Sequence, residues 1–131
     1  MSERIVKLKL NLIDCLDNDA INTQSMFGTI TENPKRITYT EEDNNTEVEL
    51  LVLENELHLK RQYDGTTKIS FYLGKEGQFE IKDEQGSFSG SVKTLKILHQ
   101  NDLIYVHYRL YANDDLITEQ KLELSIQEAK A

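Results

Sequence analysis

Four residues near the middle of the chain raise the first chemical question. Leu57, Leu59, Arg61 and Tyr63 occupy every second position, so an unbroken β-strand would direct all four to one face. If the leucines line an interior, a guanidinium among them carries a large desolvation cost unless a carboxylate pairs with it. An inward Arg61 therefore requires a carboxylate, from the protein or from a ligand. A slip of one residue before the turn after Tyr63 would instead leave Arg61 outside.

Two further segments add polar groups and space to the same predicted interior. Thr118 and Gln120 alternate in step with the leucines that follow them, and Gly90 alternates in step with Phe88. Aromatic walls with a few convergent polar groups are typical of a small-molecule pocket. The alternative is a filled interior in which Gly90 only relieves a bend. The candidate ligand-binding residues are Arg61, Tyr63, Leu59, Phe71, Phe88, Gly90, Tyr108, Thr118 and Gln120.

The residue types that serve catalysis and metal binding are scattered. Cys15 is the one cysteine; a nucleophilic cysteine needs a base nearby in space, and a packing role is the commoner one. His58, His99 and His107 lie far apart and form no two-histidine motif, so they would meet at a metal only through convergence in three dimensions. The sequence therefore predicts no catalytic residue, no metal ligand and no cofactor.

Two acidic pairs could suggest acid–base chemistry. Glu41 with Glu42 and Asp114 with Asp115 both fall in polar, turn-like stretches. Water would solvate carboxylates there, so we expect a surface role. An enzyme has no positive support in the sequence.

The pattern that surrounds these residues is that of β-strands. Apolar residues alternate with polar ones from Val6 almost to the end of the chain, and turn signals such as Asp64–Gly65 recur about every ten residues. A change of phase after Val92 predicts a β-bulge near Lys93 and Thr94. The sequence predicts one all-β domain over residues 1–131, an antiparallel up-and-down barrel of about ten strands. Closure favours a barrel over a sandwich because it removes the exposed edges.

Composition excludes several classes of protein. The chain has 131 residues, 38% of them hydrophobic and 29% charged, and a net charge of -8. This charge argues against nucleic acid, whose phosphates are bound mainly by Lys and Arg. The first residues form no continuous apolar block, so we expect neither a signal peptide nor membrane insertion. With a single cysteine, a cytoplasmic location is expected.

Three aromatic residues suggest a different function. Tyr105, His107 and Tyr111 alternate with the inward set on the segment "LIYVHYRLY" and would stand together outside. Tyrosine is enriched at protein interfaces, so this face is the candidate for a protein partner, including a second copy in a homodimer. A cross-strand aromatic row that only stabilises the sheet is the alternative.

The order of the segments resembles that of a known family. "RITYTEED", a strand ending in "LKR", then "GTTKISFYLGKEGQFEI", "GSFSGSVKTLKI" and "LITEQKLELSIQE" resemble the YwiB-like family of uncharacterised bacterial proteins. The resemblance implies a calycin-type barrel, similar to lipocalins and fatty-acid-binding proteins. By analogy it implies non-enzymatic binding of a small apolar or amphipathic ligand, although fold alone does not establish function.

Overall fold

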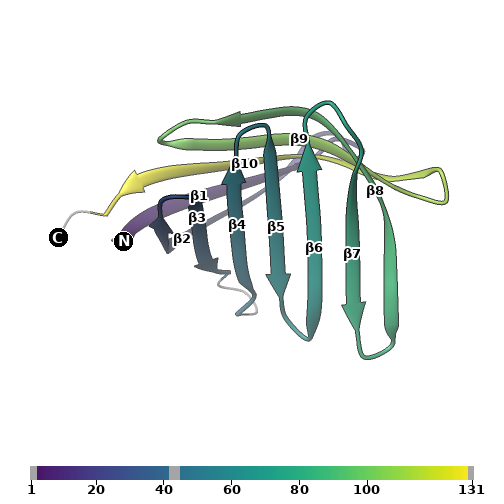
Figure 1. Ribbon diagram of the computed structural model, residues 1–131, viewed down its shortest axis with the longest axis horizontal. Helices are drawn as coiled ribbons and strands as arrows, with labels where there is room; N and C mark the ends of the chain where they lie inside the picture. The colour runs from purple at the N-terminus through teal and green to yellow at the C-terminus, as the bar shows by residue number, and fades with distance from the viewer. Residues whose placement is uncertain (1–2, 42–44, 130–131) are drawn as a thin grey trace.

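The computed structural model describes residues 3–41 and 45–129, and this part of the chain forms one closed antiparallel β-barrel (Figure 1). Each strand pairs with the next along the chain, and β1 also pairs with β10, which closes the ring. The prediction of an all-β, up-and-down barrel of about ten strands is confirmed. The strands are β1 (Arg4–Asp14), β2 (Ala20–Thr31), β3 (Lys35–Thr40), β4 (Glu47–Leu53), β5 (Glu56–Gln62), β6 (Gly65–Tyr72), β7 (Gly77–Asp83), β8 (Gly86–His99), β9 (Leu103–Ala112) and β10 (Asp115–Glu128).

Tight turns join the strands at the positions where the sequence places short polar residues. Asn113 and Asp114 both have positive φ, which matches the two-residue reversal that the right-handed twist of a hairpin prefers. Asn55 reverses the chain between β4 and β5, and Asp64 does so between β5 and β6. Asn and Asp tolerate this left-handed conformation better than most residues. The local sequence therefore sets the lengths of these hairpins.

The interior of the barrel is filled by the apolar half of the alternating pattern. Every strand contributes to this core, and residues such as Phe71 and Leu50 are almost fully buried. Burial of each such side chain stabilises the fold by about 1.5–3 kcal/mol. The core consists of Val6, Leu8, Leu10, Met26, Ile30, Ile37, Tyr39, Val48, Leu50, Val52, Leu57, Leu59, Ile69, Phe71, Phe79, Val92, Ile104, Val106, Tyr108, Leu122 and Leu124.

Two bulges interrupt the ladders on either side of β9. The register between β8 and β9 shifts between Thr94 and Lys96, which confirms the bulge predicted from the change of phase. The register between β10 and β9 shifts between Leu116 and Thr118, a bulge that the sequence did not signal. An extra residue returns the alternation to the core face beyond each bulge.

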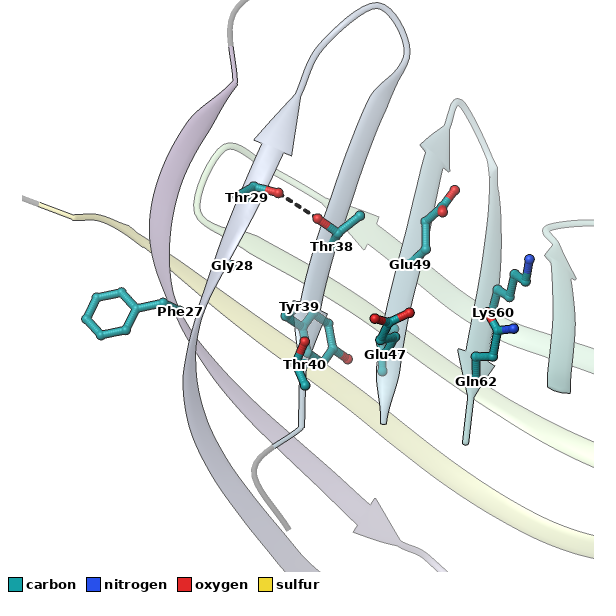
Figure 2. Close-up of a pocket in the computed structure, with 11 residues that line it drawn as sticks. Phe27, Gly28, Thr29, Thr38, Tyr39, Thr40, Glu47, Glu49, Lys60 and Gln62 are labelled. Carbon is teal, nitrogen blue, oxygen red and sulfur yellow. Dashed lines mark hydrogen bonds between the residues drawn. The ribbon is translucent and has the colours of Figure 1, made fainter. Parts of the chain in front are cut away.

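The strands differ in length, so the wall of the barrel is uneven. β2 pairs with β1 through Ala20–Ile30 but with β3 only through Gly28–Thr31. β2 and β3 separate beyond that point (Figure 2). Gly28 lies where they meet, and a Cβ there would lie 2.6 Å from both a Leu8 side-chain atom and the Thr38 carbonyl oxygen. Only glycine allows this close approach.

Successive strands alternate in direction, so the turns that follow the odd-numbered strands all lie at one end of the barrel. This end, here called the polar end, carries the β1–β2, β3–β4, β5–β6, β7–β8 and β9–β10 turns. The β5–β6 and β7–β8 turns lie at the bottom of the view in Figure 1. Within residues 3–41 and 45–129, no helix is long and apolar enough to cross a membrane.

Candidate binding site at the polar end of the barrel

The inward-facing rows change from apolar to polar as they approach the polar end. On β5 the row continues from Leu57 and Leu59 to Arg61, and on β3 it continues from Tyr39 to Glu41 just beyond the strand. A polar layer therefore lies over the apolar core at this end. Its members, by parity with the core residues of their strands, are Gln24, Glu41, Thr46, Arg61, Thr67, Thr118 and Gln120.

The centre of this layer is an ion pair between Arg61 and Glu41. Arg61 lies opposite Val48 in the β4–β5 ladder, so it projects to the inner face at the rim. Its Nε and Nη2 groups donate to Glu41 Oε1 over 2.9 and 2.7 Å. Glu41 is only 8% exposed, whereas the Arg61 side chain is 44% exposed. The carboxylate that an inward arginine requires thus comes from the protein.

Glu41 is the site residue that sequence reasoning missed. The expectation of a solvated surface carboxylate is wrong for Glu41, which is buried and bonded to Arg61; Glu42, its predicted companion, lies outside the described residues. A backbone hydrogen bond of 2.8 Å from Glu41 N–H to the Thr46 carbonyl closes the β3–β4 turn and fixes this position. The one signal in the sequence was parity, because Glu41 continues the alternation of Ile37 and Tyr39.

Two tyrosines connect the polar layer to the core. Burial raises the pKa of both Tyr39 and Tyr108 far above the usual value, and the Glu41 carboxylate raises the pKa of Tyr39 further, while Arg61 acts in the opposite direction on both. Both hydroxyls therefore stay protonated at pH values where an exposed tyrosine ionises. The Tyr108 hydroxyl donates to Gln120 Oε1 over 2.6 Å.

A buried acceptor lies beside the ion pair. Gln24 Nε2 donates to Glu41 Oε2 over a long 3.4 Å, and Gln24 Oε1 is buried with no hydrogen-bond partner in the described part of the chain. Buried polar atoms are rarely left without a partner, so such an atom marks a place for a water molecule or for a ligand donor.

A hollow of about 310 Å³ opens at the rim beside Arg61. Its volume is at the lower end of those that hold small ligands. Ile81 faces Phe88 across the β7–β8 ladder, and both are exposed, Phe88 to 49%. Tyr63 and Ile81 line the hollow together with Arg61 and give it apolar surface. The hollow is lined by Thr46, Arg61, Tyr63, Asp64, Gly65, Thr66, Thr67, Ile81, Lys82 and Asp83.

The structure divides the predicted ligand-binding residues between this end and the core. Arg61, Tyr63, Thr118 and Gln120 lie at the polar end, where Tyr108 reaches Gln120. Leu59 and Phe71 are buried in the core, and Phe71 packs on Tyr108 with ring centroids 4.8 Å apart. Phe88 lies at the rim.

The expectation that Gly90 leaves room in the interior is wrong. A Cβ at Gly90 would lie 2.0 Å from the Tyr111 carbonyl oxygen and 2.6 Å from the Phe79 ring. The Phe79 ring therefore occupies the space that the missing side chain leaves. Gly90 is required for this packing, so its role is structural.

The predicted interface residues lie on the outer face of β9. Tyr105, His107 and Tyr111 alternate with the buried Ile104, Val106 and Tyr108, and all three are half-buried. His107 Nε2 lies 2.8 Å from Glu119 Oε2, so this side chain is engaged within its own sheet.

A second hollow, of about 420 Å³, lies on the outer face of β2 to β5 (Figure 2). It forms where β2 leaves β3, and hydroxyl and charged groups line it. The Thr29 and Thr38 hydroxyls are 2.6 Å apart. The other polar side chains come from β4, which supplies Glu47 and Glu49, and from β5, which supplies Lys60 and Gln62 (Figure 2). From sequence these outward polar residues were indistinguishable from an ordinary solvated face.

Fold and site together define a closed ten-stranded barrel with a filled core and a polar layer at one end. The chain belongs to the family described as "Domain of unknown function (DUF1934)", whose model matches residues 14–124. No curated protein shows significant sequence similarity to the chain. The crystal structure of ywiB protein from Bacillus subtilis is similar, with a TM-score of 0.77 and 14% identity, over 98% of this chain and 94% of that one. The resemblance to the YwiB-like family is thereby confirmed, and at this identity the likeness establishes the fold alone.

Proposed function

We propose that the protein is a non-enzymatic binding barrel that holds a small amphipathic molecule at its polar end, with a ligand carboxylate on Arg61. The observation that carries this proposal is the position of Arg61, a partly exposed guanidinium that lines a hollow of about 310 Å³. The ligand lies at the rim because the core below it is packed with side chains. Tyr63 and Ile81, which line the hollow, take the place of the wall expected from Leu59, Phe71 and Phe88.

The ion pair with Glu41 prepares Arg61 for this role. Glu41 accepts two of the five N–H donors of the guanidinium, and it fixes the orientation of the planar group. The donors that Glu41 does not use suit a second carboxylate in a forked arrangement. A guanidinium already held in place loses less conformational freedom when the ligand arrives.

The titratable groups of the polar layer favour binding over catalysis. Burial raises the pKa of Tyr39 and Tyr108, so both phenols stay protonated well above neutral pH and neither serves as a base. Glu41, the buried carboxylate, is committed to Arg61. General base catalysis needs a group that takes up a proton near neutral pH, and these residues are arranged to hold hydrogen bonds instead.

The test is calorimetric titration with octanoate and benzoate, two carboxylates of small size. Arg61→Ala should lower affinity by about 10-fold or more, the usual contribution of a charge-assisted hydrogen bond. Glu41→Gln should change affinity less than Arg61→Ala does, because glutamine keeps an acceptor that orients the guanidinium while it removes a competing carboxylate. Arg36→Ala is the matched control, since Arg36 is similarly exposed and pairs with Glu49 on the outer face. Absence of binding by both acids, or an equal loss in Arg36→Ala and Arg61→Ala, would reject the proposal.

The second candidate is a protein-interaction module. The observation that favours it is exposed apolar surface beside a predicted interface residue: Leu116 and Ile117 are exposed, and Leu116 faces Tyr111 across the β9–β10 ladder. Exposed leucine and isoleucine beside a tyrosine is a common composition for a contact with another protein or a second copy. Sedimentation velocity tests for self-association. A concentration-dependent dimer that Leu116→Glu abolishes would favour this function, and a monomer at all concentrations would exclude the homodimer.

A further inference from the structure

Three potential metal ligands, two on adjacent strands and one in the turn after β1, converge on the outer face of the barrel near the polar end. Cys15 follows β1, His107 belongs to β9 and Glu119 belongs to β10. The thiol sulfur, an imidazole nitrogen and a carboxylate oxygen all lie within 4.8 Å of one another, and the three residues are half-buried. From this geometry we propose that Cys15, His107 and Glu119 form a site for a divalent transition metal ion such as Zn²⁺, separate from the hollow beside Arg61.

The strand order explains why these residues meet. β10 lies between β1 and β9 in the ring, so Glu119 has Cys15 on one side and His107 on the other. The Cys15 N–H donates to the Glu119 carbonyl over 2.9 Å, which extends the β1–β10 ladder by one bond. Across the β9–β10 ladder, Glu119 lies opposite Arg109, and His107 is its diagonal neighbour. Long side chains on diagonal positions of adjacent strands reach each other.

Hydrogen bonds already hold the donor atoms in place. His107 Nε2 lies 2.8 Å from Glu119 Oε2, and Arg109 Nε donates to Glu119 Oε1 over 2.7 Å. These bonds lower the pKa of the Glu119 carboxyl. The Cys15 sulfur lies within 4.8 Å of the carboxylate oxygen. Arg109 keeps one carboxylate oxygen engaged and leaves the other directed at His107.

The donor set suits an ion of intermediate softness. Sulfur, imidazole nitrogen and carboxylate oxygen are all ligands of Zn²⁺, which is held by three protein ligands and one water in open tetrahedral sites. Ligands at tetrahedral zinc are roughly 3.3–3.8 Å apart, as follows from bonds of about 2.0–2.3 Å. Separations of up to 4.8 Å therefore need only side-chain rotation. Arg109 would act as the outer partner that orients Glu119.

The charges and protons balance on binding. The Cys15 thiol releases its proton to solvent and binds as the thiolate, and His107 binds as the neutral imidazole through Nε2 with its proton on Nδ1. Thiolate and carboxylate together offset the two positive charges of the ion. No oxidant or further reactant is required.

The direct test is titration of the reduced protein with Co²⁺, which reports its ligands by absorption. We expect one ion per chain, d–d bands of tetrahedral intensity and a thiolate-to-cobalt charge-transfer band. Cys15→Ser should abolish the charge-transfer band, while His107→Gln and Glu119→Gln should each weaken binding by about 100-fold. His58→Gln is the matched control. His58 Nε2 also lies 2.8 Å from a carboxylate oxygen, that of Glu56, but among the described residues this pair belongs to no group of three potential metal ligands.

A second measurement on the unmodified chain removes any dependence on the folding of the variants. Equimolar Zn²⁺ should slow alkylation of Cys15 by iodoacetamide at least tenfold, and a chelator should restore the rate. Absence of a charge-transfer band together with unprotected Cys15 would overturn the proposal. The proposal would also be overturned if His58→Gln weakened Co²⁺ binding as much as His107→Gln does.

Discussion

The pair formed by Arg61 and Glu41 gives the sharpest prediction, because the two partners differ so much in exposure. Arg61→Met removes the charge and keeps most of the aliphatic stem, so it leaves a buried carboxylate without its cation. Removal of one partner from a fully buried pair costs about 3–5 kcal/mol. Because the Arg61 side chain is 44% exposed, water replaces part of the lost interaction, and we expect about 2 kcal/mol.

Substitution of the other partner, Glu41, should lower the free energy of unfolding by less. Glu41→Gln leaves the guanidinium in contact with solvent and keeps a hydrogen-bond acceptor in place, so we expect a loss of about 1 kcal/mol or less. The double variant no longer contains the buried carboxylate. Its loss in free energy of unfolding should therefore be smaller than the sum of the losses in the two single variants by about 1 kcal/mol. The asymmetry follows from burial alone.

Urea unfolding of the four proteins measures these free energies. Arg36→Met is the control, because Arg36 and Glu49 are both exposed and 3.4 Å apart, and its effect should stay within about 0.5 kcal/mol. Additive losses, or a loss for Arg61→Met no larger than that for Arg36→Met, would refute the role assigned to the ion pair.

The remaining predictions concern the core and the rim. Gly90→Ala should destabilise the barrel by about 1–3 kcal/mol in urea unfolding, because the added Cβ would lie 2.0 Å from a backbone oxygen of β9; a neutral effect would contradict the packing described. Phe71→Ala should cost about 3–5 kcal/mol and Phe88→Ala about 1 kcal/mol, and thermal unfolding should separate them. The raised pKa values of Tyr39 and Tyr108 stabilise the fold below about pH 10, and this contribution is lost as pH rises above the pKa of unfolded tyrosine. Alkaline unfolding followed by phenolate absorbance should therefore begin above about pH 10, and full tyrosine ionisation before unfolding would contradict this.

The strands could be predicted because each has one buried and one exposed face. Val6, Leu8 and Leu10 alternate with lysines in the sequence and are buried in the structure, since a period of two is a property of the strand itself. The Asp64–Gly65 turn was predicted on equally local grounds, through the tolerance of these residues for positive φ.

Parity identifies the face of a residue but not its depth along the barrel. Ile81 and Phe88 share parity with core residues, yet both are exposed because they lie near the β7–β8 turn at the polar end. The position at which the inward-facing residues of a strand leave the core depends on the lengths and stagger of all the strands in the ring. The same limit applies to Gly90, whose space is filled by Phe79 from the neighbouring strand.

Contacts between distant segments could not be predicted from one sequence. Glu41 and Arg61 are twenty residues apart, and they meet because of the registers of β3 with β4 and of β4 with β5. His107 and Glu119 are neighbours within the β9–β10 hairpin, and Cys15 joins them only because the barrel closes β1 onto β10. Closure is a property of the complete ring, and no local pattern encodes it.

NMR of methyl groups and of the Arg61 guanidinium during titration with octanoate tests most directly whether the barrel binds ligands at its polar end over a filled core. Binding at the rim predicts shifts for the Ile81 methyls and the Arg61 Nε–H. The Leu50 and Ile104 methyls, which are buried in the core, should not move. Large shifts of the core methyls would show that the interior opens to admit the ligand. No shift at Ile81 and Arg61 would contradict a binding site at the polar end.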